Sequence, residues 1–535
     1  MDGPRRRGPE RRGVISDIVD RDWDVIVIGT GMGGGTLGRR LAEAGQSVLF
    51  LDRGPGGLAM EQHGLNEVMA DPFARQIRGF WPTPVRAESN ELQPESLPPL
   101  GAGMGGTSVF YAASLERPER HDFEDLPGRP HPTGGWAASY GDFEPYFREA
   151  EKWFHVCGGD DPLSPDGPAG LADGPALSEG DRVTMEDFRR GGWHPYRAHI
   201  GIRYLPGCTE CIGAKCPRDC KMDGRSAGVK PALATGNAHL LDNCTVRRLV
   251  GTKTRIDRVE AVRGGETLSF RGRHVVLAAG ALSSPRLLLA SASEDWPDGC
   301  ANESGLVGCN LMLHLNEMIA IWPSRKADFT GPAKTISVRD FYHWEGQRFG
   351  LLQSMGLGAE YGNVFHFLGK QFDRSAFRHV PVLKQFLRLP ALAAVWFFGG
   401  ARIYSGILED LPTVTNRVVH DPARPDEITV KYQMTDAFEA RRQAYRRVIR
   451  RELRKQRLFF LTPDPELNYA HACGTLRFGA DPAKSVVDAD CKAHSIDNLH
   501  VADASFMPTS TGVNPSLTNA ANAMRVADAI LRTGS

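Results

Sequence analysis

The apolar positions near the start of the chain follow two patterns, short continuous runs and a helical spacing. The run DVIVIG (24–29) is β-branched and apolar, which is typical of a strand buried on both faces of a parallel sheet. TLGRRLAEAG (36–45) has helical spacing and ends on a glycine, and SVLFLD (47–52) is a second apolar run. Together these segments predict a strand, a helix and a second strand in one βαβ unit.

Apolar and polar residues alternate in later segments that are bounded by turn residues. This alternation predicts half-buried strands. The segments are NEMIAIWPS (316–324), ARIYSGILED (401–410), TNRVVHD (415–421) and EITVKYQMT (427–435). Residues 435–457 have helical spacing instead and predict one long helix, with Asp436 as the candidate N-cap and Glu439 three residues later. We interpret the arginines of this helix as a solvated face.

A G-x-G-x-x-G pattern directly follows the first predicted strand. Such glycines allow a sharp turn, let backbone N–H groups approach a pyrophosphate at a helix N-terminus, and let helix and strand pack closely. An acidic residue at the end of the second strand can accept the ribose hydroxyls. The predicted dinucleotide-binding residues are Gly29, Gly31, Met32, Gly33, Gly34 and Asp52. A glycine-rich turn in a purely structural βαβ unit is the alternative, and the spacing does not distinguish NAD from FAD.

The composition limits the classes of function. The chain has 535 residues, which is too many for one small domain, and its hydrophobic content of 41% is sufficient for a large core. Lysine and arginine total 64, as do aspartate and glutamate, so the formal net charge is zero. Because a neutral chain has no global field to attract nucleic acid, we expect no nucleic-acid partner.

Two segments bear on the cellular location of the protein. The basic segment MDGPRRRGPERRG (1–13) is not followed by an apolar stretch, so we expect no secretory signal and a cytoplasmic protein. The most apolar later segment, LPALAAVWFFGG (389–400), is too short to cross a bilayer, and Lys384 and Arg388 precede it. We therefore expect no membrane span, while contact of this segment with a membrane surface stays open.

Cys208, Cys211, Cys216 and Cys220 stand in one short segment with the spacing C-x2-C-x4-C-x3-C. Four thiols at this spacing are candidate ligands for zinc or an iron–sulfur cluster. They can also form disulfides or stay reduced beside an active site. We expect a structural role and no bound metal, and a reducing cytoplasm disfavours stable disulfides.

Segments at both ends and in the middle of the chain resemble the glucose–methanol–choline (GMC) oxidoreductases, in the order of that family. The segments are residues 101–123 (GAGMGGTSVFYAASLERPERHDF), 274–292 (HVVLAAGALSSPRLLLASA), 305–315 (GLVGCNLMLHL) and 485–531, which contains VADASFMPTSTGVNPSLTNAANAMRVADAIL. The resemblance implies an enzyme that uses FAD to oxidise an alcohol to a carbonyl compound by hydride transfer to flavin N5. Its electron acceptor is O₂ or another acceptor, and its oligomeric state stays unknown.

The same resemblance implies an α/β architecture with a Rossmann-like FAD-binding domain and an inserted α+β substrate domain on an antiparallel sheet. The expected FAD-binding domain is discontinuous and comprises residues 1–140, 225–310 and 465–535. The expected substrate-binding domain comprises residues 141–224 and 311–464, with the cysteine-rich loop at 208–220.

Two short segments near the C-terminus match the catalytic marks of the family. His471 of HACGT matches the histidine that serves as base, and Asn514 of GVNPSLT matches its partner. The His/Asn combination is similar to pyranose-oxidase-like and cholesterol-oxidase-like members. A neutral imidazole is a suitable base near neutral pH, and Pro515 restrains Asn514 toward extended geometry. Taken alone, His471 is also compatible with a turn histidine bonded to backbone.

The resemblance also implies contacts to FAD outside the first glycine loop. The implied residues are Gly106, Thr107, Val246, Asp503, Asn514 and Pro515. Phe110 stands where the pyranose-oxidase-like members carry the histidine that tethers FAD, and Tyr111 replaces an asparagine of the glucose-oxidase-like members. Because phenylalanine cannot form the tether, we expect noncovalent FAD.

The nature of the alcohol stays open at this point. We expect a sugar, glycoside or aminoglycoside. A sterol or other hydrophobic alcohol is an alternative, motivated by the apolar residues 389–400. A flavin electron-transfer protein built around the four cysteines is an alternative of another class.

Overall fold

A computed structural model describes residues 16–56, 72–166, 169–356 and 361–533. The basic segment 1–13 lies outside the described residues. The largest sheet has seven strands in the order β8-β2-β1-β11-β10-β9, with β21 also paired to β11. These strands are β1 (Asp22–Ile28), β2 (Val48–Leu51), β8 (Ala238–Leu241), β9 (Cys244–Thr252), β10 (Arg255–Arg263), β11 (Glu266–Leu277) and β21 (Leu499–Val501). Strands β8, β2, β1, β11 and β21 run parallel, whereas β9 and β10 continue from β11 as an antiparallel ribbon.

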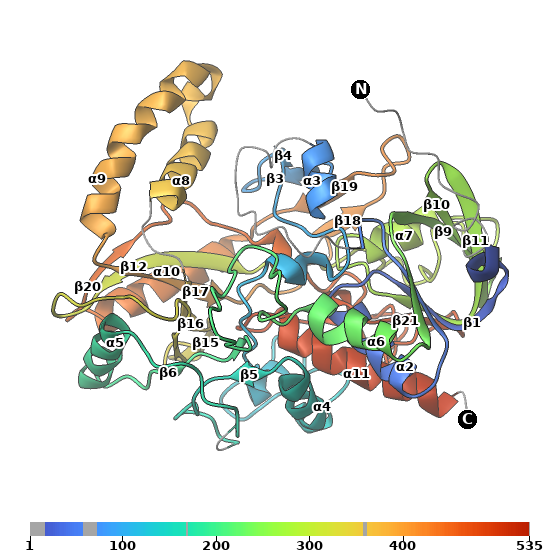
Figure 1. Cartoon of the computed structure of the whole chain (residues 1–535), viewed down its shortest axis with the longest axis horizontal. Coiled ribbons are helices and arrows are strands. Elements are labelled where there is room, and N and C mark those ends of the chain that lie inside the picture. Colours follow the sequence, from blue (N-terminus) through green and yellow to red (C-terminus); the bar gives the residue numbers. More distant parts are fainter. Residues whose placement is uncertain (1–15, 57–71, 167–168, 357–360, 534–535) are drawn as a thin grey trace.

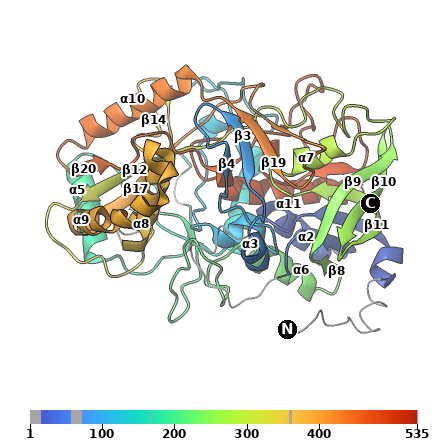
Figure 2. The ribbon, with the colours of Figure 1, turned by 90° about the horizontal axis from the view of Figure 1, so that it is seen from above.

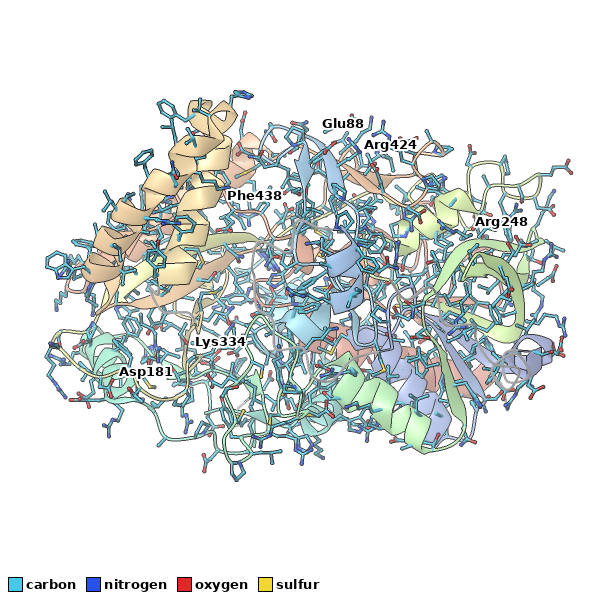
Figure 3. All side chains as sticks on the ribbon, turned by 45° about the horizontal axis from the view of Figure 1, so that its top comes forward. Glu88, Asp181, Arg248, Lys334, Arg424 and Phe438 are labelled. Atoms are coloured by element: carbon cyan, nitrogen blue, oxygen red, sulfur yellow. The ribbon has the colours of Figure 1, made fainter. Side chains whose placement is uncertain are left out.

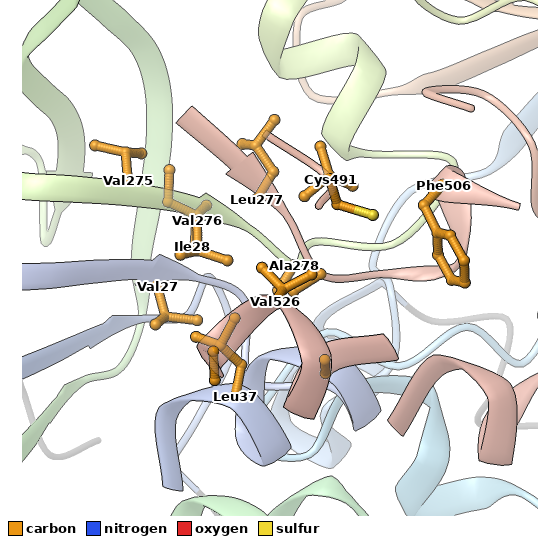
Figure 4. Close-up of a cluster of buried hydrophobic side chains, with 14 of the residues drawn as sticks. Val27, Ile28, Leu37, Val275, Val276, Leu277, Ala278, Cys491, Phe506 and Val526 are labelled. Atoms are coloured by element: carbon orange, nitrogen blue, oxygen red, sulfur yellow. The ribbon is translucent and has the colours of Figure 1, made fainter. Parts of the chain in front are cut away.

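The predicted βαβ unit is confirmed. Helix α2 (Met32–Glu43) links β1 to β2, and Gly45 follows it with a φ of +86°, a conformation that favours glycine. Helix α11 (Ser516–Thr533) packs against α2 and buries most of its length. Figure 4 shows the core between the sheet and these helices, where Val27 and Val276 of neighbouring strands approach Leu37 of α2 and Val526 of α11.

A second sheet has six antiparallel strands in the order β20-β12-β17-β16-β13-β6. The strands are β6 (Tyr196–Arg197), β12 (Leu315–Trp322), β13 (Ile336–Val338), β16 (Leu352–Ser354), β17 (Arg402–Leu408) and β20 (Arg457–Phe460). Helix α10 (Asp436–Glu452) belongs to the same side of the molecule, away from the parallel sheet (Figure 1, Figure 2). The fold class predicted from sequence, an α/β part with parallel strands joined to a part built on an antiparallel sheet, is confirmed.

A third sheet crosses the expected domain division. It has the order β18-β19-β3-β4, made of β18 (Arg417–Val419), β19 (Ile428–Tyr432), β3 (Val85–Ser89) and β4 (Glu95–Ser96). Strand β3 lies in the segment assigned to the FAD-binding domain, whereas its neighbour β19 lies in the segment assigned to the substrate domain. The domain bounds stay a prediction, and the two parts share this sheet.

Two smaller sheets and the remaining helices complete the described chain. The small sheets are β5 (Val156–Cys157) with β7 (Ile200–Gly201), and β14 (His343–Trp344) with β15 (Gln347–Arg348). The helices are α3 (Pro72–Arg78), α4 (Tyr140–Trp153), α5 (Glu179–Arg190), α6 (Lys230–Ala234), α7 (Ser284–Ala290), α8 (Tyr361–Arg374) and α9 (Arg388–Phe398). Among the described helices, none is long and apolar enough to cross a membrane.

One helix start differs from the sequence prediction. The N-cap of α10 is Thr435, whose hydroxyl accepts a hydrogen bond of 3.1 Å from the N–H of Phe438, so the assignment of Asp436 as N-cap was wrong by one residue. Threonine and aspartate are both good caps, and the geometry selects the residue that still has extended backbone, here with ψ at 153°. The helix also ends at Glu452, because Arg457 already belongs to β20.

Candidate active site

The first glycine loop lies between β1 and α2, and its glycines have different surroundings. A Cβ on Gly33 would lie 1.5 Å from the carbonyl oxygen of Ala502, and one on Gly34 would lie 2.2 Å from that of Gly29. Gly29 itself has a φ of +98°. These three positions require glycine because of close packing or backbone conformation. At Gly31, in contrast, a Cβ would meet nothing within 4 Å.

The surroundings of Gly31 fit a dinucleotide. Gly31 is the N-cap of α2, its position offers no side-chain cap, and the first turn of α2 carries no acidic residue. Helix α11 also begins here, since a Cβ on Gly33 would lie 2.9 Å from Oδ1 of Asn519. Oδ1 of Asn519 and Oγ1 of Thr518 are buried without a hydrogen-bond partner in the described structure. Uncapped helix N-termini attract a pyrophosphate, and the two buried oxygens leave polar atoms for a bound group to satisfy.

Asp52 lies directly after β2 and is buried. Its carboxylate accepts hydrogen bonds from the backbone N–H and hydroxyl of Thr30 and from the N–H of Gly54. Burial raises the pKa of Asp52, although these donors oppose the effect. The N–H of Cys244, the first residue of β9, bonds to the carbonyl of Asp52 at 2.8 Å, and Val246 follows two residues later on the same strand. Asp52 thus orders the loop, and its bond to a ribose stays a prediction.

The second glycine loop packs directly on the first. Gly106, with a φ of +56°, approaches so closely that its Cβ would lie 2.9 Å from Cα of Gly31. The hydroxyl of Thr107 accepts from the N–H of Gly101 and thereby closes the loop. Phe110 stacks on Phe80 with 3.8 Å between ring centroids, so it fills an apolar cluster. The structure therefore gives Phe110 a packing role, and it offers no atom for a covalent flavin link.

Asp503 connects several turns beside the parallel sheet. It is buried, and its carboxylate accepts from the N–H of Gly280 at 2.9 Å, from the N–H of Ser505 at 2.9 Å, and from the hydroxyls of Ser284 and Ser505. Burial raises the pKa of Asp503, while the hydrogen bonds act in the opposite direction. This carboxylate orders the turns before α7 and after β21, and its predicted contact with FAD is not tested by these bonds.

His471 is bonded to a second histidine that sequence reasoning missed. Nδ1 of His471 lies 3.1 Å from Nδ1 of His314, and Nε2 of His314 lies 2.8 Å from the carbonyl oxygen of Thr511. His314 is completely buried directly before β12, and burial lowers its pKa. Desolvation is the main cause that lowers the pKa of His471 well below the ordinary 6.5, and unfavourable electrostatic interactions of a protonated His471 with His314 and Lys334 add to it. Both rings are therefore neutral at pH 7.

This pair fixes the tautomer of His471. The carbonyl oxygen of Thr511 can only accept, so Nε2 of His314 carries the hydrogen. A neutral His314 then has its lone pair at Nδ1, where it accepts the hydrogen of Nδ1 of His471. The remaining nitrogen of His471, Nε2, therefore has the free lone pair that a general base requires.

The segment before Asn514 is held from several sides. The N–H of Gly512 donates to the hydroxyl of Tyr342 at 2.9 Å, and the carbonyl of Gly512 accepts from Leu351. Nε2 of Gln353 on β16 donates to Oδ1 of Asn514 at 2.9 Å. With its oxygen engaged, the Asn514 side chain keeps its N–H₂ group for another acceptor. Pro515 follows directly and is buried at the entry to α11, whose Asn519 N–H bonds to its carbonyl.

His471 and Asn514 are thus connected through one short network. Thr511 accepts the hydrogen bond from His314 and lies three residues before Asn514, while His314 contacts His471. The two residues that the sequence paired as catalytic are therefore linked through a single intervening histidine. In the sequence His314 stands in GLVGCNLMLHL, a segment that resembles the family but contains no motif typical of a catalytic histidine.

The four-cysteine loop lies against the second glycine loop. The ammonium group of Lys221 donates to the carbonyls of Val109 and Tyr111 on one side, and to those of Cys211 and Ala214 on the other. All cysteines of this loop are thiols, namely Cys208, Cys211, Cys216 and Cys220. Within the described residues no three His, Cys, Asp or Glu side chains gather as metal ligands. The loop thus packs against the second glycine loop and supports it. The absence of a bound metal stays a prediction.

Comparison with known proteins identifies the family. The GMC oxidoreductase models match residues 26–316 and 413–523. The chain belongs to the GMC oxidoreductase family. The predictions of this family, of an enzyme that oxidises alcohols, and of FAD as the cofactor are confirmed.

Relatives extend the likeness along nearly the whole chain. The chain is 30% identical to a 6'''-hydroxyparomomycin C oxidase of Streptomyces lividus and 29% identical to a paromamine 6'-oxidase of Streptomyces fradiae. Each comparison covers 98% of this chain and 95% of the relative. An FAD-dependent oxidoreductase of Chaetomium thermophilum has a similar fold, with a TM-score of 0.63 at 16% identity over 96% of this chain and 99% of the other.

Proposed function

We propose that this chain oxidises a hydroxyl group of a sugar, glycoside or aminoglycoside to a carbonyl group. The observation that carries the proposal is the chain of hydrogen bonds from Thr511 through His314 to His471, which leaves Nε2 of His471 as an unprotonated base. The oxidases similar over nearly the full chain act, by their names, on paromamine and hydroxyparomomycin, and they support an amino sugar as the substrate.

FAD, when bound, supplies the ring that accepts a hydride from the alcohol carbon. The residues of this chain manage the proton. His471 takes the hydroxyl proton at Nε2, and Nδ1 keeps its hydrogen bond to His314. Asn514, with its oxygen occupied by Gln353, donates an N–H to the same substrate oxygen and stabilises the developing alkoxide. Catalysis in this scheme needs neutral imidazoles, and desolvation of both rings favours the neutral form.

The substrate class is tested by anaerobic bleaching of the flavin absorbance with a panel of alcohols. We expect reduction by paromamine and related amino sugars at far lower concentrations than by cholesterol or simple primary alcohols. Rapid reduction by cholesterol with none by amino sugars would replace the proposed substrate with a hydrophobic alcohol. Reduction only by a protein donor would favour the electron-transfer alternative. The same assay repeated with O₂ and with an artificial dye identifies the type of electron acceptor.

A cytoplasmic location belongs to the same proposal. The ten cysteines support it, because all of them are free thiols and a reducing compartment keeps thiols unpaired.

We expect His314 to act as a positioning residue for His471. Substituting His314→Leu removes the acceptor for Nδ1 of His471 and the donor to Thr511, so His471 loses its tautomer and orientation. The rate constant of flavin reduction should fall about 10²-fold, the cost of a misplaced reacting group, while the substrate dissociation constant changes little. Stopped-flow reduction at several substrate concentrations separates the two quantities.

The variant His314→Gln is the matched control, since its amide has both an acceptor oxygen and a donor nitrogen. It should keep most of the wild-type rate. Equal losses in His314→Leu and His314→Gln, with unchanged FAD content, would mean that His314 only fills space.

A further inference from the structure

Residues 361–400 form a hairpin of α8 and α9 that stands away from the rest of the molecule. We name it the α8–α9 hairpin. It connects β16 to β17, two neighbouring strands of the six-stranded sheet, and in Figure 1 it projects at the upper left beyond both sheets. Figure 2 shows the two helices together at one end of the molecule, and in Figure 3 their side chains point outward from the protein body.

The outer surface of this hairpin is apolar. Its exposed large apolar side chains are Phe377, Val380, Val382, Leu383, Phe386, Leu389, Leu392, Trp396 and Phe397. Trp396 is 86% exposed, Leu389 72% and Phe386 62%. Soluble proteins seldom expose such a contiguous group unless it meets a partner, because each side chain loses the stabilisation that burial provides.

The exposed residues of α9 share one face. Leu389, Leu392 and Trp396 stand at helical spacing, and Ala391 between them is buried toward the hairpin interior. After Arg388 the sequence of α9, LPALAAVWFF, contains no charged, hydroxyl or amide side chain. The indole N–H of Trp396 is therefore the only side-chain group on this face that can hydrogen-bond.

The charge of the hairpin differs from that of the whole chain. Residues 361–400 contain five lysines or arginines and one aspartate, a formal net charge of +4 in a chain whose net charge is zero. The charged residues are Lys370, Asp373, Arg374, Arg378, Lys384 and Arg388. Arg378 and Lys384 stand among apolar residues in the segment between the two helices, and Arg388 begins α9. Positive charge beside exposed tryptophan and phenylalanine matches the interface of an anionic bilayer.

We propose that the α8–α9 hairpin docks this enzyme on the surface of an anionic lipid bilayer. The apolar face of α9 enters the boundary between headgroups and acyl chains, and the basic residues meet lipid phosphates. The 11 residues of α9 span about 16 Å, about half of a hydrocarbon core of about 30 Å, so the helix lies in the interface and does not cross.

A second copy of the chain fits this surface less well. In a symmetric dimer the same patch meets itself, so the two hairpins would bring together two groups of net charge +4. An anionic bilayer, in contrast, accepts both the apolar and the basic residues. The proposal is independent of which alcohol the enzyme oxidises.

The test is flotation of the FAD-loaded enzyme with two kinds of vesicle, one of phosphatidylcholine and one of equal parts phosphatidylcholine and phosphatidylglycerol. We expect binding to the mixed vesicles that is at least about tenfold tighter than to pure phosphatidylcholine and that weakens with added salt. The variant F386S/L389S/W396S should bind at least about tenfold more weakly. Its control is Phe73→Ser, since Phe73 is 72% exposed on α3, and this variant should bind like the wild type.

A second pair of variants tests the charge. Lys384→Glu with Arg388→Glu should abolish the preference for phosphatidylglycerol, whereas Arg248→Glu with Arg424→Glu, two exposed arginines outside the hairpin, should retain it. Equal FAD content in all variants controls for folding. If the serine substitutions impair folding, Trp396→Phe replaces them, and it should abolish the blue shift of tryptophan emission on vesicle binding.

Two results would overturn the proposal. One is no binding of the wild type to either vesicle. The other is a concentration-dependent dimer that the variant F386S/L389S/W396S loses without any vesicle binding by the wild type, which would assign the hairpin to contact between copies.

Discussion

Replacing His471 by alanine is expected to slow flavin reduction by the alcohol about 10²–10⁴-fold, the usual contribution of a placed general base. His471 is the residue whose Nε2 is left unprotonated by the bond from its Nδ1 to His314. FAD content should hardly change, because the glycine loops and helix N-termini that are predicted to hold FAD do not include His471. The measurement is anaerobic stopped-flow loss of flavin absorbance at saturating substrate.

A matched control separates the base from histidine in general. His494 is half-buried and bonded to the hydroxyl of Ser485 at 2.8 Å, away from the predicted pair, so His494→Ala should reduce at the wild-type rate. Near-normal reduction by His471→Ala would remove His471 from the chemistry. Asp410 would then be the next candidate base, since burial raises its pKa to about 7. Glu409 is less suited, because Arg348 pairs with it at 2.8 Å.

The pH dependence of the wild type adds a second check on the same group. The pKa of His471 is lowered, first by burial and then by His314 and Lys334, so the neutral form already dominates at the ordinary imidazole pKa of 6.5. A base is active above its pKa and lost as the pH falls through it. The reduction rate constant should therefore stay constant as the pH falls through 6.5 and decline only at lower pH. A midpoint at or above 6.5 would contradict the lowered pKa of His471.

Asn514 is expected to share its task with His471. Substituting Asn514→Ala should also slow reduction, and the losses should be less than additive in the double variant because both groups act on one oxygen. Additive losses would mean that the two residues act in separate steps.

The sequence was most informative where local patterns determine structure. The βαβ unit was predictable because continuous apolar runs, helical spacing and glycines all lie within thirty residues, Trp23–Asp52. The pairing of β3 with β19 could not be predicted, because neither segment carries a local pattern that identifies its partner. Arg86 of β3 and Glu427, for example, are bonded although they stand 341 positions apart in the sequence. Such non-local pairing depends on the packing of the whole chain.

The candidate site likewise combines residues that local motifs predict with a residue that only non-local contacts identify. His471, Asn514 and the glycines stand in short motifs whose residue types suggest chemistry. His314 stands in an apolar segment, LMLHL, where a histidine reads as part of a core. Only the folded structure reveals its role, because folding brings Thr511 and His471 into contact with its two nitrogens. A buried polar ring needs partners for both nitrogens, and the structure identifies them.

Substitutions in the first glycine loop should also have large effects. Two of its glycines, Gly31 and Gly33, distinguish an effect on folding from an effect on FAD binding. Gly33→Ala is expected to destabilise the FAD-free protein, because the new Cβ would lie 1.5 Å from the carbonyl oxygen of Ala502. Helix α2 would have to move away from the turn that follows β21, at a cost of about 1–3 kcal/mol or more in the free energy of unfolding. Urea unfolding of FAD-free protein measures this loss.

Gly31→Ala should behave differently. Gly31 has a φ of −64° and a Cβ there would meet nothing within 4 Å, so the FAD-free protein should keep its stability to within about 0.5 kcal/mol. The added methyl group would enter the space where backbone N–H groups approach the pyrophosphate, and FAD affinity should fall at least about tenfold, or 1.4 kcal/mol. Fluorescence titration of FAD-free protein with FAD measures the affinity. Wild-type affinity in Gly31→Ala would mean that the pyrophosphate does not lie against Gly31, whereas equal destabilisation by both substitutions would mean that Gly31 also serves packing.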